Sequence, residues 1–226
     1  MVTPQIVHPN ALLAALPPSE LDLVLSASEH VVVIAGTVLY SDNGAPPPTV
    51  YFPESGLISI RSTLSSGAQA EVAGVGRESA FGLFATLGVG LPAIVAEVTL
   101  DMAAVTLTLD VFRRFFHTLP VLRTTTSRSL GEVFVEVVRS AGCYRFHTHQ
   151  QWLARWLLSS ADKAQQETLP VTHDMIARTI GSPRHAVSAS LAQLRSQELI
   201  AYERGTIRIL NRSELKAVAC DCYGAR

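Results

Sequence analysis

The stretch from Thr168 to Leu210, TLPVTHDMIARTIGSPRHAVSASLAQLRSQELIAYERGTIRIL, carries two short helical patterns separated by a glycine turn. Thr172 stands where the N-cap of the first helix belongs, and Gly181 can adopt the left-handed conformation that ends it. We expect Ser182 to cap the second helix, with Pro183 at its first position. Two helices joined in this way outline a helix-turn-helix motif, although any pair of packed helices in a helical domain would give a similar pattern.

The second helix of this stretch indicates which side chains would meet a ligand. Its buried stripe begins at Val187 and continues at i+4 and i+7, which leaves polar residues near the N-terminal end on other faces. In a helix-turn-helix protein this end enters the major groove of DNA, where an arginine can bind guanine O6 and N7. The residues that we expect to approach bases are Arg184, His185 and Ser188.

A β-hairpin is predicted after the second helix, because two apolar runs, 199–202 and 206–210, flank a short turn. Its tip, Arg204-Gly205-Thr206, is small and basic enough to lie against phosphate. We expect Thr172, Arg204 and Thr206 to bind phosphates, which sets the position on DNA rather than the sequence that is read.

The N-terminal part of the chain has a different pattern. From His30 to about Leu109, short runs rich in Val, Ile and Thr alternate with turn clusters such as Ser41-Asp-Asn-Gly44. Many short strands at this spacing predict an antiparallel sandwich or jelly roll. With the helices that follow, they place the chain in the α+β class.

After Pro120 the pattern becomes helical, with one apolar stripe at i, i+3, i+4, i+7, i+8 and i+11. The stripe consists of Leu130, Val133, Phe134, Val137, Val138 and Ala141. Such a stripe must be buried against another surface. It either packs on the chain's own N-terminal domain or pairs with the same helix of a second subunit, and the spacing alone supports both alternatives equally.

Composition limits the classes of protein to which the chain can belong. An apolar content of 48% with 16% charged residues argues against disorder. No apolar run is long enough to span a bilayer, the N-terminus does not read as a signal peptide, and three cysteines are too few for a disulfide framework. We therefore expect a cytoplasmic protein without a membrane partner. Residues 146–226 carry ten Lys and Arg against seven Asp and Glu, a balance of +3 that permits a polyanionic partner without establishing one.

Several blocks, in order along nearly the whole chain, resemble the family of the cyclic-AMP receptor protein and the FNR-type regulators (the CRP/FNR family). They include Val50-Tyr-Phe-Pro-Glu-Ser-Gly-Leu-Ile58, Trp152-Leu-Ala-Arg-Trp-Leu-Leu158, the helix-turn-helix and Arg204-Gly-Thr-Ile-Arg-Ile-Leu210. The resemblance implies a cupin-like β-roll sensor, similar to cyclic-nucleotide-binding domains, at residues 1–117. A dimerisation helix at 118–145 and a winged helix-turn-helix DNA-binding domain at 146–226 would follow.

The same resemblance implies a function in transcription regulation. It implies a homodimer that binds a palindromic operator in double-stranded DNA, with RNA polymerase as a further partner. It therefore favours dimerisation as the role of the apolar stripe over residues 130–141.

Departures from the family pattern concern the effector. Cyclic-nucleotide-binding members carry a Gly-Glu-Leu-Gly block, whose Glu holds the ribose, and an Arg-Ser-Ala block, whose Arg pairs with the cyclic phosphate. The matching blocks here read Ser79-Ala-Phe-Gly82 and Leu91-Pro-Ala93, so neither charged group is present. A buried phosphate without its guanidinium loses charge-assisted hydrogen bonds, and we expect that cyclic AMP is not bound in the usual pose. The residues of the candidate effector pocket are Arg77, Glu78, Ala80, Gly82 and Leu91, although Arg77 and Glu78 fit an exposed turn better.

Other constellations support no cofactor and no catalysis. No cysteine precedes Cys143, which excludes the N-terminal iron–sulfur ligands of oxygen-sensing relatives. Cys220-Asp-Cys222 supplies only two metal ligands and would need help from a partner chain or a histidine, so we interpret it as a free-thiol tail and expect no metal site. His147 and His149 are interpreted as a solvated hinge. No nucleophile elbow, phosphate loop or HExxH motif occurs, and no enzymatic activity is expected.

The second helix also departs from the family's Arg-Glu-x-x-Gly/Ser-Arg pattern, because it reads Arg184-His-Ala-Val-Ser-Ala189. We expect a different half-site from that of the best-known members. The alternative is an effector- or protein-binding module in which sequence-specific DNA binding is weak or lost, and Ala189 in place of the second arginine supports it.

Overall fold

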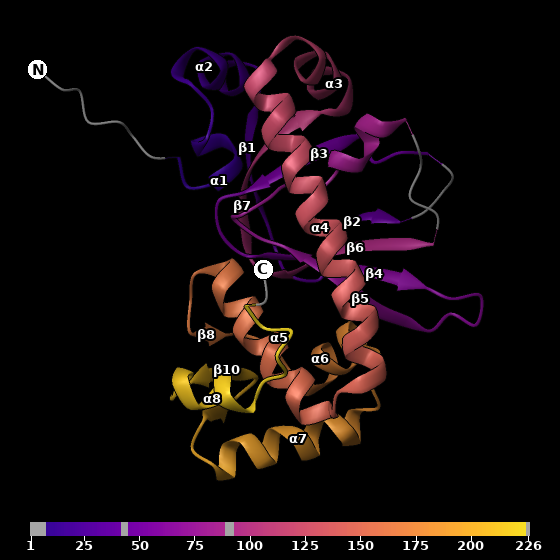
Figure 1. The fold of residues 1–226 in the computed structure, drawn as a ribbon, viewed down its shortest axis with the longest axis vertical. Coiled ribbons are helices and arrows are strands. Elements are labelled where there is room, and N and C mark those ends of the chain that lie inside the picture. The colour runs from indigo at the N-terminus through magenta and orange to yellow at the C-terminus, as the bar shows by residue number, and fades with distance from the viewer. Residues whose placement is uncertain (1–7, 42–44, 89–92, 225–226) are drawn as a thin grey trace, which may run out of the picture.

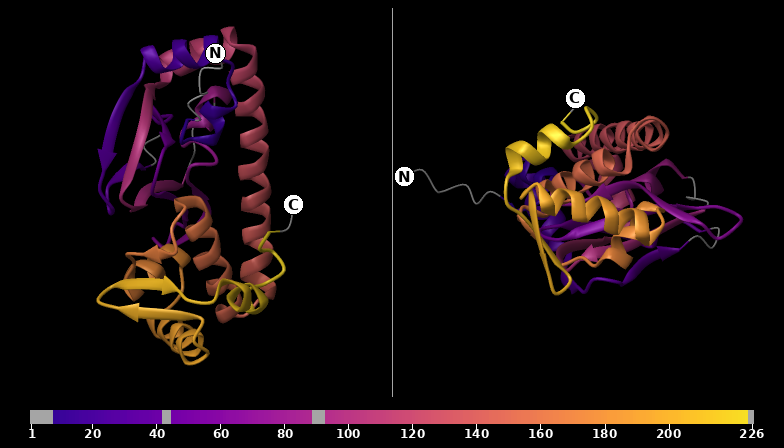
Figure 2. Two further views of the ribbon diagram at one scale, coloured as in Figure 1. Left: turned by 90° about the vertical axis from the view of Figure 1, so that its left-hand side faces the viewer. Right: turned by 90° about the horizontal axis from the view of Figure 1, so that it is seen from below.

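The computed structural model describes residues 8–41, 45–88 and 93–224, which form two parts connected by the long helix α4 (Figure 1). The strands of the N-terminal part and the helices α5 to α8 of the C-terminal part lie at opposite ends of the molecule, and α4 runs along both (Figure 2). Within these ranges, no helix combines the length and apolar character needed to cross a bilayer.

The N-terminal part is a β-roll of two antiparallel sheets, with the strand orders β1-β7-β3 and β2-β6-β4-β5. The strands are β1 (Glu29–Val33), β2 (Val38–Ser41), β3 (Thr49–Pro53), β4 (Leu57–Thr63), β5 (Gln69–Val75), β6 (Ile94–Leu100) and β7 (Met102–Thr108). Helices α1 (Ala11–Ala14), α2 (Pro18–Ser26), α3 (Leu109–Thr118) and the 3-10 helix η1 (Leu83–Leu87) complete this part. The predicted antiparallel β-rich domain and the α+β class are confirmed.

Successive side chains of β4 point alternately into the roll and towards its outer surface. Ile58 and Ile60 point into the apolar interior of the roll, whereas Leu57 belongs to the core of the C-terminal part. Ser59 and Arg61 share the outer face with Leu57. The roll therefore has an apolar interior and a more polar outer surface next to the C-terminal part.

Helix α4 (Pro120–Phe146) begins at a proline, whose missing N–H costs nothing at that position. The carboxylate of the buried Glu20 accepts hydrogen bonds from the backbone N–H groups of Val121 at 3.1 Å and Leu122 at 2.8 Å. It satisfies two donors that the helix leaves unpaired and places negative charge at the positive end of the helix dipole.

The C-terminal part packs around α5 (His149–Ala164), which carries the buried side chains of Trp152, Leu153 and Leu157. Its other elements are β8 (Thr168–Leu169), α6 (His173–Ile180), α7 (Arg184–Ser196), β9 (Ile200–Glu203), β10 (Thr206–Ile209) and α8 (Arg212–Val218). The strands form one antiparallel sheet in the order β8-β10-β9.

The turn between α6 and α7 lies against the edge of the roll. Gly181 has a φ of +65°, and a Cβ atom at this position would lie 2.6 Å from the carbonyl oxygen of Gln69 in β5. A side chain at residue 181 is therefore excluded twice, by backbone conformation and by the space left between the two parts.

Candidate nucleic-acid interface

Helices α6 and α7 form the predicted helix-turn-helix. The hydroxyl oxygen of Thr172 accepts a hydrogen bond from the N–H of Met175 at 3.2 Å, so Thr172 is the N-cap of α6 as predicted, and Gly181 ends that helix. The prediction that Ser182 caps α7 is wrong. The N–H of Ser182 binds the carbonyl of Ala177 and completes the end of α6, and the N-cap of α7 is Pro183.

The N-terminal end of α7 presents two of the predicted base-contacting residues to solvent. Arg184 and His185 are exposed, and α7 lies at the end of the molecule opposite α2 and α3 (Figure 1). The Nε atom of Arg184 lies 3.0 Å from a carboxylate oxygen of Asp174 in α6. Both side chains are more than half exposed, and an ion pair of that kind is worth less than about 1 kcal/mol, so Arg184 can exchange Asp174 for another acceptor.

Ser188 has a different environment from the other two. It is half-buried, and its Oγ lies 2.9 Å from Nδ1 of His173, whose ring packs on that of Tyr202 with centroids 4.4 Å apart. Burial and the nearby charge of Arg184 lower the pKa of His173, which favours the neutral ring. Ser188 therefore helps to join α6, α7 and the hairpin, and its hydroxyl is less free than predicted.

The hairpin has the two-residue turn that its twist requires. Arg204 and Gly205 have φ values of +48° and +79°, and Glu203 pairs with Thr206 across the turn. A Cβ atom at Gly205 would lie 3.4 Å from Cγ2 of Thr172. The structure thus brings together Thr172, Arg204 and Thr206, the three residues predicted to bind phosphates.

A groove of about 380 Å³ lies between α7 and β9. Its lining includes Ser188, Arg195 and Tyr202. One of its lining residues, Arg195, was not among the residues predicted from the sequence. Arg195 is exposed and follows Arg184 by eleven residues, which returns it to nearly the same face of an α-helix. The eleven-residue spacing from Arg184 could have identified Arg195 from the sequence as a third basic group, after Arg184 and Arg204.

Residues 151–218 match the sequence family described as the Crp-like helix-turn-helix domain. This stretch is a Crp-like helix-turn-helix domain. The recognition helix, its glycine turn and the wing all lie within the matched residues, so the resemblance predicted from the sequence is confirmed for this part. The comparison with curated proteins gives no match.

Solved structures extend the similarity to the whole fold. FixK2 from Bradyrhizobium japonicum has a TM-score of 0.71 at 17% identity, over 85% of this chain and 98% of its own. A CRP-family transcriptional regulator from Thermus thermophilus has a TM-score of 0.70 at 24% identity, over 87% and 100%. The c-di-GMP responsive global regulator CLP from Xanthomonas campestris has a TM-score of 0.68 at 16% identity, over 85% and 99%. The chain therefore has the CRP/FNR fold, with a roll, a central helix and the Crp-like domain.

The predicted apolar stripe of α4 is divided between two sides of the helix. Leu130, Val133 and Val137 pack on the roll of the same chain. Phe134, Val138 and Ala141 are exposed on the other side. The exposed side also presents Val135 and the unobstructed Gly131, which sequence reasoning left out. Both alternatives for the stripe thus find support, each for different residues.

The candidate effector residues are not brought together. Ala80 and Gly82 line an apolar cavity of about 10 Å³ between the roll and α4, which is room for about one water molecule. The Arg77 guanidinium instead binds the carbonyl of Pro9 at 3.0 Å, and Glu78 lies 3.5 Å from Lys163 in α5. Arg77 and Glu78 lie in the turn after β5 and point away from the cavity, and Leu91 lies outside the described residues.

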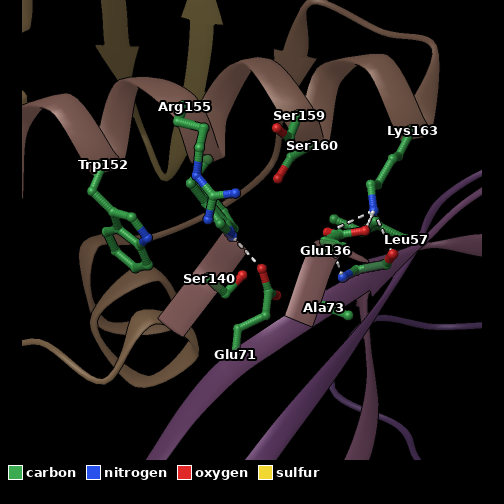
Figure 3. A pocket seen from close by; sticks show the side chains of 12 residues that line it. Leu57, Glu71, Ala73, Glu136, Ser140, Trp152, Arg155, Ser159, Ser160 and Lys163 are labelled. Carbon is green, nitrogen blue, oxygen red and sulfur yellow. Dashed lines mark hydrogen bonds and ion pairs between the residues drawn. The ribbon is translucent and has the colours of Figure 1, made fainter. Parts of the chain in front are cut away.

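A buried polar cluster joins the roll to the Crp-like domain (Figure 3). The side chain of Glu71 in β5 accepts a hydrogen bond from the indole N–H of Trp156 at 2.9 Å, and its backbone carbonyl accepts one from the hydroxyl of Tyr144 at 2.7 Å. Burial raises the pKa of Glu71 to about 7.

The same cluster contains Lys163, which is largely shielded from solvent and points toward Glu136 (Figure 3). The Lys163 ammonium binds both carboxylate oxygens of Glu136, at 2.9 and 2.7 Å. Burial opposes the charge of Lys163, but Glu136 and Glu78 outweigh it and raise its pKa. A charged lysine thus stands near a carboxyl that is half protonated near neutral pH. No local sequence pattern signals this cluster, because its members come from three separate elements.

Proposed function

We propose that the chain is a DNA-binding transcription regulator of the CRP/FNR type that acts in the cytoplasm as a homodimer on a palindromic operator. The observation that carries this proposal is the free end of the Crp-like domain. There Arg184 and His185 are exposed at the start of α7, and the hairpin tip that carries Arg204 and Thr206 approaches Thr172, the third residue that we propose to bind phosphates.

Dimerisation is supported by the exposed side of α4. Phe134 is 64% exposed and Val138 55% exposed within one chain, with small residues at Gly131 and Ala141 that let a second helix approach closely. Large apolar side chains gathered on one face of a helix mark an interaction surface. A second copy of α4 supplies the same face, and a two-fold dimer places two recognition helices on symmetric half-sites.

Independence from cyclic AMP is supported by the inside of the roll. Ala80 replaces the carboxylate that would hold a ribose, and the cavity beside it has a volume of about 10 Å³ with apolar lining. A nucleotide phosphate placed there would lose its hydration without gaining a charged partner. We further propose RNA polymerase as a partner, no membrane association, no cofactor in the roll and no enzymatic activity.

The test is selection of bound sequences from a random double-stranded DNA pool by the purified chain without added ligand. Enrichment of a palindrome is the expected result. The Arg184→Ala variant should select a palindrome in which the base preference is weaker at one position of each half-site. Arg123→Ala, at an exposed position near the start of α4 and far from the recognition helix, is the matched control. No enrichment, with or without cell extract, would favour the alternative of a module that has lost sequence-specific binding.

A further inference from the structure

Three cysteines and a histidine meet where the central helix ends. Cys143 lies in the last turn of α4 and His147 is its C-cap, whereas Cys220 and Cys222 follow α8 near the end of the chain. Their four ligand atoms all lie within 4.8 Å of one another. The sulfur atoms of Cys143 and Cys220 are 3.2 Å apart, and that of Cys222 is 3.9 Å from Nδ1 of His147.

These distances suit a single tetrahedral ion. A zinc ion with Zn–S bonds of about 2.3 Å keeps its ligand atoms about 3.8 Å apart, between the two distances just given. Three thiolates and an imidazole are a structural zinc set, and thiolate ligands select soft or borderline metals over magnesium and calcium. We propose that Cys143, His147, Cys220 and Cys222 bind one Zn²⁺ ion.

The atoms around His147 fit a metal-binding imidazole. Its Nε2 lies 3.2 Å from a carboxylate oxygen of Asp221, while Nδ1 faces the cysteines. Metal-bound histidines commonly donate their other N–H to a carboxylate, which fixes the tautomer and the ring orientation. His147 and Cys143 also lie at the C-terminal end of α4, where the helix dipole favours a cation.

The tail that carries two of the ligands is held in place by contacts of its own. The backbone N–H of Cys220 binds the carbonyl of Gln151 at 3.3 Å. Three residues after it, the Tyr223 hydroxyl donates to Asp162 at 2.7 Å and accepts from Arg212 at 2.9 Å. The site is therefore largely formed before a metal binds.

Burial and ligand number indicate a structural role for the ion. Cys143 and Cys220 are buried, and four protein ligands complete a tetrahedral shell without an open position for a substrate. The ion would tie the C-terminal tail to the junction of α4 and α5. This assignment replaces the interpretation of the tail as free thiols, because His147 and Cys143 supply the ligands that the tail lacks.

The experiment is a titration of the reduced, metal-free full chain with Co²⁺. This ion can occupy zinc sites, and its absorption spectrum depends on the coordination geometry. We expect one Co²⁺ per chain, with sulfur-to-cobalt charge-transfer absorption and the intense visible bands of tetrahedral coordination. One equivalent of Zn²⁺ should abolish both. Zinc content of the chain isolated without added metal should approach one ion per chain.

Variants assign the ligands. Cys222→Ser, at a half-exposed position, should lower the charge-transfer intensity and weaken Co²⁺ binding by more than the roughly 10- to 100-fold that loss of an outer-shell partner costs. His147→Ala should do the same, whereas the exposed neighbour His149→Ala should leave binding unchanged. Asp221→Asn should weaken binding by about 10- to 100-fold with the spectral shape kept, as for a residue that positions a ligand.

Two results would overturn the proposal. One is the weak spectrum of octahedral Co²⁺ without charge transfer, at any stoichiometry. The other is a Cys143–Cys220 disulfide in chain isolated under anaerobic conditions, together with no Co²⁺ binding after reduction. Folding of each variant is checked by circular dichroism, and His149→Ala and Cys222→Ser keep the test interpretable if a buried ligand variant fails to fold.

Discussion

The roll and the Crp-like domain keep their ionisable side chains in different places. The side chains that fill the described interior of the roll are apolar, and so is the lining of the cavity of about 10 Å³ between the roll and α4. At the far end of the Crp-like domain, by contrast, Arg184 and Arg204 are exposed to solvent, and Arg184 makes only a surface ion pair with Asp174. A further set of charged groups, Glu71 and Lys163 among them, lies between the two parts. This difference points to the contact between the two parts, and to α4, as the places where a change in the roll would reach the recognition helix.

The largest effect is expected inside the roll. Phe81 is buried and lines the cavity, so Phe81→Ala should lower the free energy of unfolding by about 3–5 kcal/mol, since it removes packed atoms and leaves a void. Guanidinium unfolding measures this. Phe146→Ala is the control, because Phe146 is 79% exposed, and it should change the stability little. A loss at residue 81 no larger than the control's would mean that the roll holds an adaptable pocket and not a packed core.

The next largest effect is expected on dimerisation, from a change on the exposed side of α4. Phe134→Glu should weaken dimerisation by about 2–4 kcal/mol, because it buries a charge in an apolar interface. Sedimentation equilibrium measures the dissociation constant. Leu64→Glu changes an equally exposed leucine at the end of β4 and should leave the dimer intact. Equal dissociation constants for both variants and the unchanged chain would place the dimer interface elsewhere.

The contact between the two parts should be sensitive to pH through Glu71. Its pKa is about 7 in the folded chain against an ordinary 4.5, so the folded state binds more protons between these values. The stability that Glu71 contributes is complete below pH 4.5 and is lost as the pH rises through 7, by at most about 3 kcal/mol.

Glu71→Gln removes this titration. The difference in free energy of unfolding between the unchanged chain and the variant should therefore move in favour of the variant from pH 5 to pH 8. Glu132→Gln, at an exposed position of α4, is the control and should keep the original pH dependence. Parallel curves for Glu71→Gln and the unchanged chain would contradict the raised pKa.

The smallest effect concerns base reading. Arg184→Ala should weaken binding to the selected operator by about 1–3 kcal/mol, because one bidentate contact to guanine is lost. Fluorescence anisotropy with the operator and with random DNA measures the two affinities. Equal losses on both DNAs would show that Arg184 binds phosphate instead of a base.

The sequence predicted the Crp-like domain better than any other part, since the signals of its helices are local. Thr172 and Gly181 act within a few residues of themselves, and each is confirmed as the beginning or the end of α6. Ser182 was assigned wrongly because a serine between two helices can either end the first helix or cap the second. Its N–H completes α6, and the second helix begins two residues later.

The stripe of α4 and the effector residues were harder to assign for physical reasons. Hydrophobic spacing tells which residues avoid water but not which surface covers them, so Val133 and Phe134 looked alike although one packs on the roll and the other is exposed. Arg77 and Ala80 are close in sequence, yet the turn after β5 sends one outwards and the other into the roll. The cysteine and histidine cluster joins residues 77 positions apart, and no local pattern reports such a distance.

The contact of Gly181 with the carbonyl of Gln69 has a consequence for protein engineering. Hybrid regulators are built by joining the DNA-binding domain of one chain to the sensor of another. Here the turn that sets the angle of the recognition helix fits against a strand edge with no space for a single methyl group. A hybrid that keeps this helix in its present orientation must therefore import the edge of β5 together with the turn, so that the natural exchange point lies inside the roll and not at the end of α4.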